Sequence, residues 1–320
     1  MALIDNLTNP ALLFFILGII AVQIKSDLMI PETSSKFISM YLLLSIGFKG
    51  GQELSHSGLH AEVIYGLVFG LFLALLVPVV TFFILKLFVG SENAGAIAAS
   101  YGSVSAVTFV TAVSFLELES ISFGGHMIAV MALMEAPAII VGVLLANLFK
   151  QAVSESNQTN MIKVLRHSLT NGSVVLLLGS MVIGFLATTE QAESIKPFTT
   201  DIFKGFLAIF LLDMGITSGK HISSIRENGI ITLLFASLMP FVNGLMALFI
   251  SMQFTDILGN QLLFAVLGAS ASYIAVPAAM KQALPNANPG LYLPMALGIT
   301  FPINVIIGIP FYYALITMLN

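Results

Sequence analysis

Apolar residues in this chain occur in long continuous runs separated by short polar or charged breaks. A run of about 20 apolar residues is long enough for a helix to cross the hydrocarbon core of a bilayer. Continuous runs argue against a membrane β-barrel, whose strands alternate apolar and polar residues. The breaks predict ten transmembrane helices, at residues 10–24, 36–48, 62–89, 93–116, 125–149, 169–187, 198–217, 228–252, 260–283 and 291–319.

The composition supports an integral membrane protein. Of 320 residues, 58% are hydrophobic and 9% are charged, whereas a soluble domain carries about 25% charged residues. The net charge of −4 provides no basic surface for nucleic acid, and the absence of Cys excludes disulfides and thiolate metal sites. No nucleotide-binding motif is present, which argues against an ATP-driven pump. We therefore expect a transporter rather than an enzyme.

Basic residues predict the orientation, because loops rich in Lys and Arg face the cytoplasm. If the loops between spans are numbered from one to nine, the odd loops hold nine basic residues and the even loops three. The nine are Lys25, Lys36, Lys86, Lys150, Lys163, Arg166, Lys220, Arg226 and Lys281. The three are Lys49, Lys196 and Lys204. The odd loops are thus predicted to be cytoplasmic and both termini to lie outside.

The two halves of the chain share a weak sequence repeat. Residues 43–51 (LLSIGFKGG) and 211–219 (LLDMGITSG) fit one pattern at an offset of 168 residues. At similar offsets, residues 101–105 correspond to 269–273 and Pro137 corresponds to Pro302. Five spans per half would give the halves opposite orientations, as in many secondary transporters. Chance similarity between apolar helices is the alternative explanation.

The fourth and ninth spans contain residues that interrupt a helix. Residues 98–108 (AASYGSVSAVT) place small and hydroxyl side chains around a Gly, where a helix is easily interrupted. Residues 267–277 (LGASASYIAVP) end at Pro277, which has no N–H to donate to the Tyr273 carbonyl oxygen. Second half-helices starting near Ser103 and Ala271 would each present free N–H groups and a partial positive charge. Because the spans run in opposite directions, these N-termini would meet at mid-membrane and bind an anion without Lys or Arg. Close helix packing would explain the small residues equally well.

Hard oxygen ligands for a small cation lie near the same segments. They are the hydroxyls of Ser100, Thr108, Ser270 and Ser272. Glu135 lies in mid-span, where a carboxylate is costly and indicates a functional role such as a cation ligand or proton carrier. Asp213 and Asn304 are further candidates, whereas Glu117 and Glu119 are expected on a solvated surface. The predicted sodium ligands are Ser100, Thr108, Glu135, Ser270 and Asn304.

From span two to the C-terminus, the chain resembles the SbtA-type sodium-dependent bicarbonate transporters. The residues that carry the resemblance are Gly102 to Ser105 with Thr108, residues 116–117, 134–138, 146–147 and 269–272, Pro277, residues 285–289 with Tyr292, Gly298, Pro302 and residues 308–310. The most specific of these is the run A-N-P-x-x-Y that ends at Tyr292.

The resemblance implies an all-α protein of ten transmembrane helices, arranged as two inverted five-helix repeats whose interrupted helices 4 and 9 cross at mid-membrane. The repeats would comprise residues 1–150 and 163–320, joined by a short cytoplasmic linker at 151–162. Spans 3–5 and 8–10 would form a core domain, and spans 1, 2, 6 and 7 a gate domain.

Family members are homotrimers of the bacterial inner membrane that take up bicarbonate with sodium. The implied anion-binding residues are Gly102, Ser103, Val104, Ser105, Ala271 and Ser272, flanked by Tyr101 and Tyr273.

Three differences from the family pattern affect these expectations. Tyr273 stands in the stretch where cyanobacterial members have Asp, and Glu135 stands in place of another Asp. The linker is shorter than the family's insert, which bears on docking of a PII-like cytoplasmic regulator.

The leading hypothesis is sodium-coupled uptake of bicarbonate or a similar small anion. One alternative is a cation or proton antiporter or organic-anion symporter on a similar scaffold. The other is a membrane sensor or structural subunit without transport.

Overall fold

The computed structural model describes residues 10–57, 60–149, 172–222 and 229–319. Within these residues the regular secondary structure is entirely helical. Six helical stretches among them are long and apolar enough to cross a membrane, namely Ala61–Val89, Ser91–Leu118, His126–Leu148, Thr189–His221, Ile230–Ser251 and Pro289–Leu319. Each coincides with a predicted span, which confirms an all-α membrane protein.

The other four predicted spans are also helical, but they are shorter, more charged or interrupted. Helices α2 (Pro10–Gln23) and α9 (Gly172–Leu186) have 14 and 15 residues. Helix α3 (Glu32–Ser57) has 26 residues, twice the predicted 36–48, and carries four charged side chains. The ninth span consists of α13 (Leu258–Ala269) and α14 (Ala275–Ala283) with a break between them. The predicted linker at 151–162 lies outside the described residues.

Most of the buried interior belongs to two groups of helices. In one group, α4 (Ala61–Val89), α5 (Ser91–Gly102) and α7 (His126–Leu148) pack against one another. In the other, α12 (Ile230–Ser251) packs on α13 and on the last span. Helix α6 (Ala106–Leu118) connects the groups by packing on α13. Fully buried side chains such as Leu73, Phe109 and Phe264 form a continuous core through both groups.

The last span is irregular because proline recurs at every eighth position, as Pro294, Pro302 and Pro310. It consists of α15 (Pro289–Pro294), η3 (Met295–Thr300), α16 (Phe301–Ile303), η4 (Asn304–Gly308) and α17 (Ile309–Leu319), where η3 and η4 are π-helical. Each proline lacks an N–H, so the backbone cannot keep regular α-helical bonds across it. π-Helical turns are frequent at functional sites, and Asn304 begins the second one.

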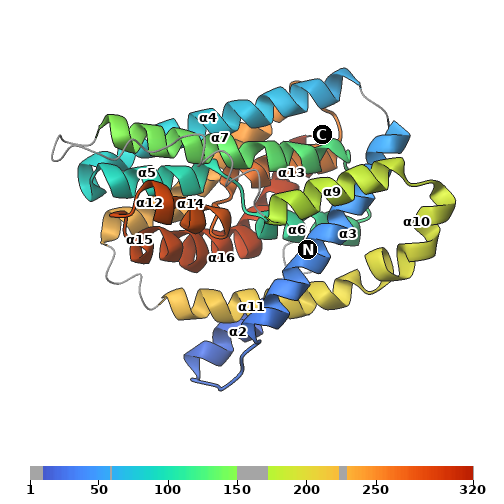
Figure 1. Ribbon diagram of the computed structural model, residues 1–320, viewed down its shortest axis with the longest axis horizontal. Coiled ribbons are helices and arrows are strands. Elements are labelled where there is room, and N and C mark those ends of the chain that lie inside the picture. Colours follow the sequence, from blue (N-terminus) through green and yellow to red (C-terminus); the bar gives the residue numbers. More distant parts are fainter. Residues whose placement is uncertain (1–9, 58–59, 150–171, 223–228, 320) are drawn as a thin grey trace.

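The remaining helices form two pairs, each containing one helix from each half of the chain. Helix α2 packs on α11 (Phe203–Ile222), and α3 packs on α9. Figure 1 shows α2 crossing α11 at the lower edge of the molecule, with α3 and α9 to the right of the core groups. Helix α10 (Thr189–Lys196) and the π-helical turn η1 (Pro197–Asp201) lead from α9 to α11.

Glycine brings the backbones of each pair into direct contact. A Cβ atom added at Gly215 of α11 would lie 2.0 Å from the backbone oxygen of Phe15 in α2. A Cβ atom at Gly51 of α3 would lie 2.0 Å from the backbone oxygen of Met181 in α9. Close contact through small residues is a common way for membrane helices to associate. Both pairs therefore depend on the absence of a side chain.

We expect Gly215→Ala to destabilise the fold by about 1–3 kcal/mol, because the added methyl group forces α2 and α11 apart. Gly205→Ala is the matched control in the same helix, since a Cβ atom there meets no other atom within 4 Å. That control should be neutral or slightly stabilising because Ala favours a helix more than Gly. Thermal unfolding of both variants in detergent measures the difference. Equal midpoints would contradict the role of close backbone contact.

Candidate functional site

Two helix breaks lie at the centre of the candidate site. Residues 103–105 separate α5 from α6, and Ser103 and Ser105 both have extended backbone conformations. Residues 270–274 separate α13 from α14, beginning with an extended Ser270. The sequence had suggested that Pro277 lies at the break itself. In the structure it lies in the first turn of α14. Its missing N–H has no acceptor to lose there.

The two breaks are hydrogen-bonded to each other. The Ser272 N–H donates to the Ser100 carbonyl oxygen at 2.8 Å, and the Ser100 hydroxyl donates to the Ser272 carbonyl oxygen at 2.6 Å. The Ser105 N–H donates to the Ser270 hydroxyl at 3.1 Å. Backbone groups that left their helices thus find partners in the opposite break. The structure therefore brings the two predicted interrupted segments together.

A cavity of about 780 Å³ reaches both breaks. Its inner part is lined by Val104 and Ser105 of the first break and by Ser272 and Tyr273 of the second. Glu135 of α7 also lines it. The opposite wall belongs to α3 and α11, and the lining extends to the N-terminal turn of α3. The cavity therefore lies between the two core groups and the paired helices.

Helix N-termini give the inner part of this cavity a positive potential. Ala106 and Val107, the first residues of α6, line the cavity, and their N–H groups have no acceptor within their own helix. Ser105 caps α6 by accepting from the Thr108 N–H at 3.1 Å. Helix α14 begins after Ile274, another lining residue, without a side-chain cap. Free N–H groups and helix dipoles favour an anion here.

Three buried polar atoms near the breaks have no hydrogen-bond partner among the described residues. They are Ser103 Oγ, Glu135 Oε1 and Asn304 Oδ1. Asn304 is held in place by its amide nitrogen, which donates to the Ala269 carbonyl oxygen at 2.7 Å. Unpaired oxygen acceptors are the groups that a hard cation binds. In the described part of the chain, no three His, Cys, Asp or Glu side chains cluster, so a cation site would depend on hydroxyl, amide and carbonyl oxygens.

Six of the eight predicted anion-binding residues fall into two sets. Val104, Ser105, Ser272 and Tyr273 line the cavity, whereas Ser103 and Ala271 are buried beside it. Tyr101 points elsewhere, because its hydroxyl bonds the Thr300 hydroxyl at 2.7 Å. Its role as a substrate contact stays a prediction.

Gly102 is explained by packing. A Cβ atom there would lie 2.4 Å from a side-chain carbon of Pro78 in α4. The absence of a side chain thus lets α5 and α4 pack closely where the first break begins. Gly102 is buried and is not among the cavity-lining residues.

The predicted sodium ligands differ in their surroundings. Ser100 and Ser270 donate their hydroxyls to backbone carbonyls, and Thr108 is buried in the first turn of α6. Of the predicted ligands, Glu135 alone lines the cavity. Glu135 and Asn304 keep an unpaired oxygen atom, which makes them the stronger candidates.

Sequence reasoning missed the wall that α3 and α11 contribute. Phe210, Met214 and Thr217 of α11 line the cavity, and the Tyr273 hydroxyl contacts the Met214 sulfur at 3.7 Å. Ser35 of α3 also lines the cavity and donates to the Asp213 carboxylate. Met214 and Thr217 belong to the repeated nine-residue pattern. That pattern was therefore a signal for the wall as well as for a repeat.

An all-helical membrane protein whose cavity ends at two interrupted helices has the architecture of a secondary transporter. Residues 10–317 match the family described as the Na+-dependent bicarbonate transporter superfamily, and the chain belongs to that family. Membership confirms the resemblance identified from the sequence and implies a transporter rather than an enzyme. The comparison with curated proteins finds no match.

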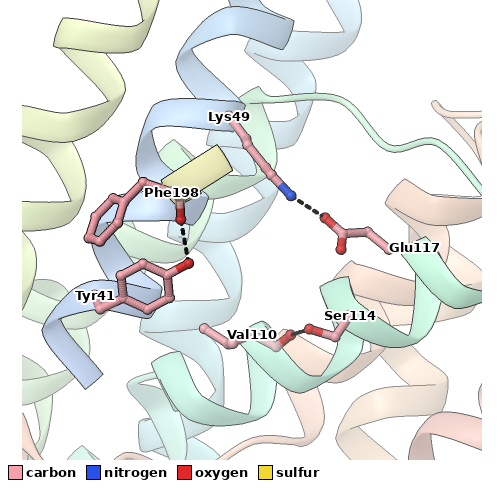
Figure 2. A network of polar contacts seen from close by, with 6 residues as sticks. All are labelled: Tyr41, Lys49, Val110, Ser114, Glu117 and Phe198. Atoms are coloured by element: carbon pink, nitrogen blue, oxygen red, sulfur yellow. Dashed lines mark hydrogen bonds and ion pairs between the residues drawn. The ribbon is translucent and has the colours of Figure 1, made fainter. Parts of the chain in front are cut away.

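We expect Ser100→Ala to destabilise the protein by about 1–2 kcal/mol, because the buried Ser272 carbonyl loses a hydrogen bond from the opposite break. Ser114→Ala is the matched control. The Ser114 hydroxyl is also buried, but it donates to the Val110 carbonyl oxygen within α6 at 2.9 Å, as Figure 2 shows. Denaturation in detergent compares the two variants. Equal losses would show that the contact between the breaks is no more important than an ordinary helix hydroxyl.

Proposed function

We propose that the protein is a sodium-coupled symporter that takes up bicarbonate, or a similar small anion, by alternating access. The observation that carries the proposal is the cavity that ends at two hydrogen-bonded helix breaks. Family membership supports both bicarbonate and sodium. The lining runs from the exposed Glu32 and Lys36 to the buried Ser105 and Ser272, so the cavity would be a path from one side of the protein to the breaks.

The proposed anion position lies in the inner cavity. Ser105 and Ser272 would donate hydroxyl hydrogen bonds, and the N-termini of α6 and α14 would supply the positive potential. A planar anion with three oxygens can accept several such bonds at once. Tyr273 also lines this part of the cavity, in the stretch where cyanobacterial members of the family have Asp.

The proposed sodium position involves Glu135 and Asn304, with hydroxyl and carbonyl oxygens from the breaks. A cation there would offset the charge of the anion, and the offset is large where the dielectric constant is low. Each ion thus makes binding of the other more favourable. By linkage, the increase in affinity is the same in both directions.

We infer that the chain consists of two inverted five-helix repeats with ten spans, at 1–150 and 163–320. The pairing of α2 with α11 and of α3 with α9 supports this topology. Spans one and six are α2 and α9, and spans two and seven are α3 and α11. A two-fold axis that exchanges α2 with α9 and α3 with α11 therefore converts the α2–α11 pair into the α9–α3 pair. The paired helices would be the gate domain, and the two groups around the breaks the core domain.

The cavity is lined at one end by the exposed Lys36 in the first turns of α3, next to the first loop, which the distribution of basic residues assigns to the cytoplasm. The structure would then represent an inward-open state, with both termini outside.

From the family resemblance, we propose a homotrimer in a bacterial inner membrane, surrounded by lipid. Any PII-like regulator would bind on the cytoplasmic face.

Uptake into proteoliposomes tests the proposed function directly. Labelled bicarbonate should accumulate when an inward sodium gradient is imposed and should not accumulate with an equal potassium gradient. Protein-free liposomes provide the background. Uptake without sodium dependence, or no uptake, would contradict the proposal. Sodium-driven release of protons, detected by a pH-sensitive dye, would support the antiporter alternative.

We expect Glu135→Gln to raise the sodium concentration for half-maximal uptake by about ten-fold, the effect of about 1.4 kcal/mol of lost binding energy. Asp213→Asn is the matched control. Asp213 is also a buried carboxylate, but it accepts a hydrogen bond from Ser35 and is not among the cavity-lining residues. Sodium titrations of uptake compare the two variants. Equal shifts would assign the cation to another position.

A further inference from the structure

An ion pair joins α3 to α6 at the end of the cavity opposite its opening. Lys49 Nζ lies 2.9 Å from Glu117 Oε1, and the two side chains are 26% and 27% exposed. Figure 2 shows Lys49 reaching from α3 toward Glu117 on α6. Lys49 also lies over the ring of Phe203 in α11, 5.0 Å from its centroid. The sequence had suggested that Glu117 belongs to a solvated surface, but it is largely enclosed by this contact.

The position of the pair follows from helix geometry. Helix α3 contributes cavity-lining residues from Glu32 to Leu43, and Lys49 lies six residues farther along, or roughly 9 Å at 1.5 Å per residue. Helix α6 contributes Val110, and Glu117 lies seven residues farther along, or roughly 10 Å. The pair therefore lies beyond the closed end of the cavity.

A buried layer separates the cavity from the ion pair. Ile46 of α3 is 2% exposed, and Val113 of α6 is also 2% exposed. Ser114 is buried and shares a helix face with Val110 and Glu117, because residues three and four apart lie on the same side of a helix. The cavity is thus open beside Lys36 and closed between Val110 and Glu117.

The repeated nine-residue pattern relates the closed end to the open one. In that pattern Lys49 corresponds to Thr217, which lines the cavity. In an inverted repeat, equivalent residues lie toward opposite sides of the membrane. When the cavity opens on the other side, Lys49 would occupy a lining position equivalent to that of Thr217. It cannot do so while it is paired with Glu117.

We propose that the Lys49–Glu117 ion pair is a latch that holds the far side of the cavity closed and separates when that side opens. The inference rests on the proposed alternating-access function. A half-buried pair is suited to this task, because its net contribution is larger than that of an exposed pair but small enough to be broken during a transport cycle. The latch joins a helix of the proposed gate domain to a helix of the proposed core domain.

The test uses the absence of cysteine from the chain. Ser114→Cys introduces a single thiol into the buried layer, where a membrane-impermeant methanethiosulfonate reagent reaches it only when the far side opens. In this background, Lys49→Gln and Glu117→Gln should each raise the labelling rate from the far side by about five-fold, as expected from losing a partly buried pair. The double charge reversal Lys49→Glu with Glu117→Lys should restore slow labelling.

Lys196→Gln is the matched control. It removes the 3.1 Å ion pair between Lys196 and Glu193, which lies within α10, so labelling should not change. Unchanged labelling in both single variants, or fast labelling in the charge-reversed variant, would overturn the latch. Equal acceleration by Lys196→Gln would also overturn it. Circular dichroism of each variant verifies folding.

The labelling rate is measured independently of uptake. The experiments can therefore contradict the latch without contradicting the proposed symport, and the reverse. Sodium-dependent uptake with unchanged labelling would overturn the latch and leave the proposed function intact. Accelerated labelling without sodium-dependent uptake would contradict the proposed symport and support the latch.

Discussion

Backbone N–H and C=O groups inside a bilayer have no water to bind, and in this protein two helix breaks satisfy them by bonding to each other. A single break in the hydrocarbon region would leave several such groups unpaired at a cost of several kcal/mol each. The exchange between Ser100 and Ser272, together with the bond from the Ser105 N–H to the Ser270 hydroxyl, removes much of that cost. Each break therefore stabilises the other. A cavity with free helix N-termini can exist only because both breaks are present.

The same contact explains why the site needs so few charges. Residues next to the breaks are mostly small, and serine hydroxyls supply donors where helices cannot. The cavity lining contains Glu32, Lys36 and Glu135 as its charged side chains, and only Glu135 belongs to a helix of the core groups. Helix N-termini provide the positive potential that Lys or Arg would otherwise supply. The low charge content of the chain is thus compatible with an anion site.

Local sequence signals predicted the helical spans and the two breaks, and they singled out Glu135, whose role as a cation ligand stays a prediction. These features follow from hydropathy, from Gly and Ser within apolar runs and from a carboxylate in mid-span. The hydrogen bond of Tyr101 could not be predicted, because its partner, Thr300, is 199 residues away in sequence. The ion pair of Lys49 with Glu117 escaped prediction for the same reason, since the register between α3 and α6 is set by packing. The position of Pro277 also differs, because the second break begins at Ser270 and has already ended before that proline.

The pairing of α2 with α11 has a consequence for synthesis of the protein in the membrane. Helix α2 precedes its partner by almost 180 residues, and the surfaces around Gly18 and Gly215 contact each other closely. Chains fold from the N-terminus as they are made, so α2 has to wait in the bilayer until most of the chain has been inserted. During this interval the glycine face of α2 has no contact with α11. The first half of the chain cannot complete its own packing, and folding of the two halves is coupled from the start.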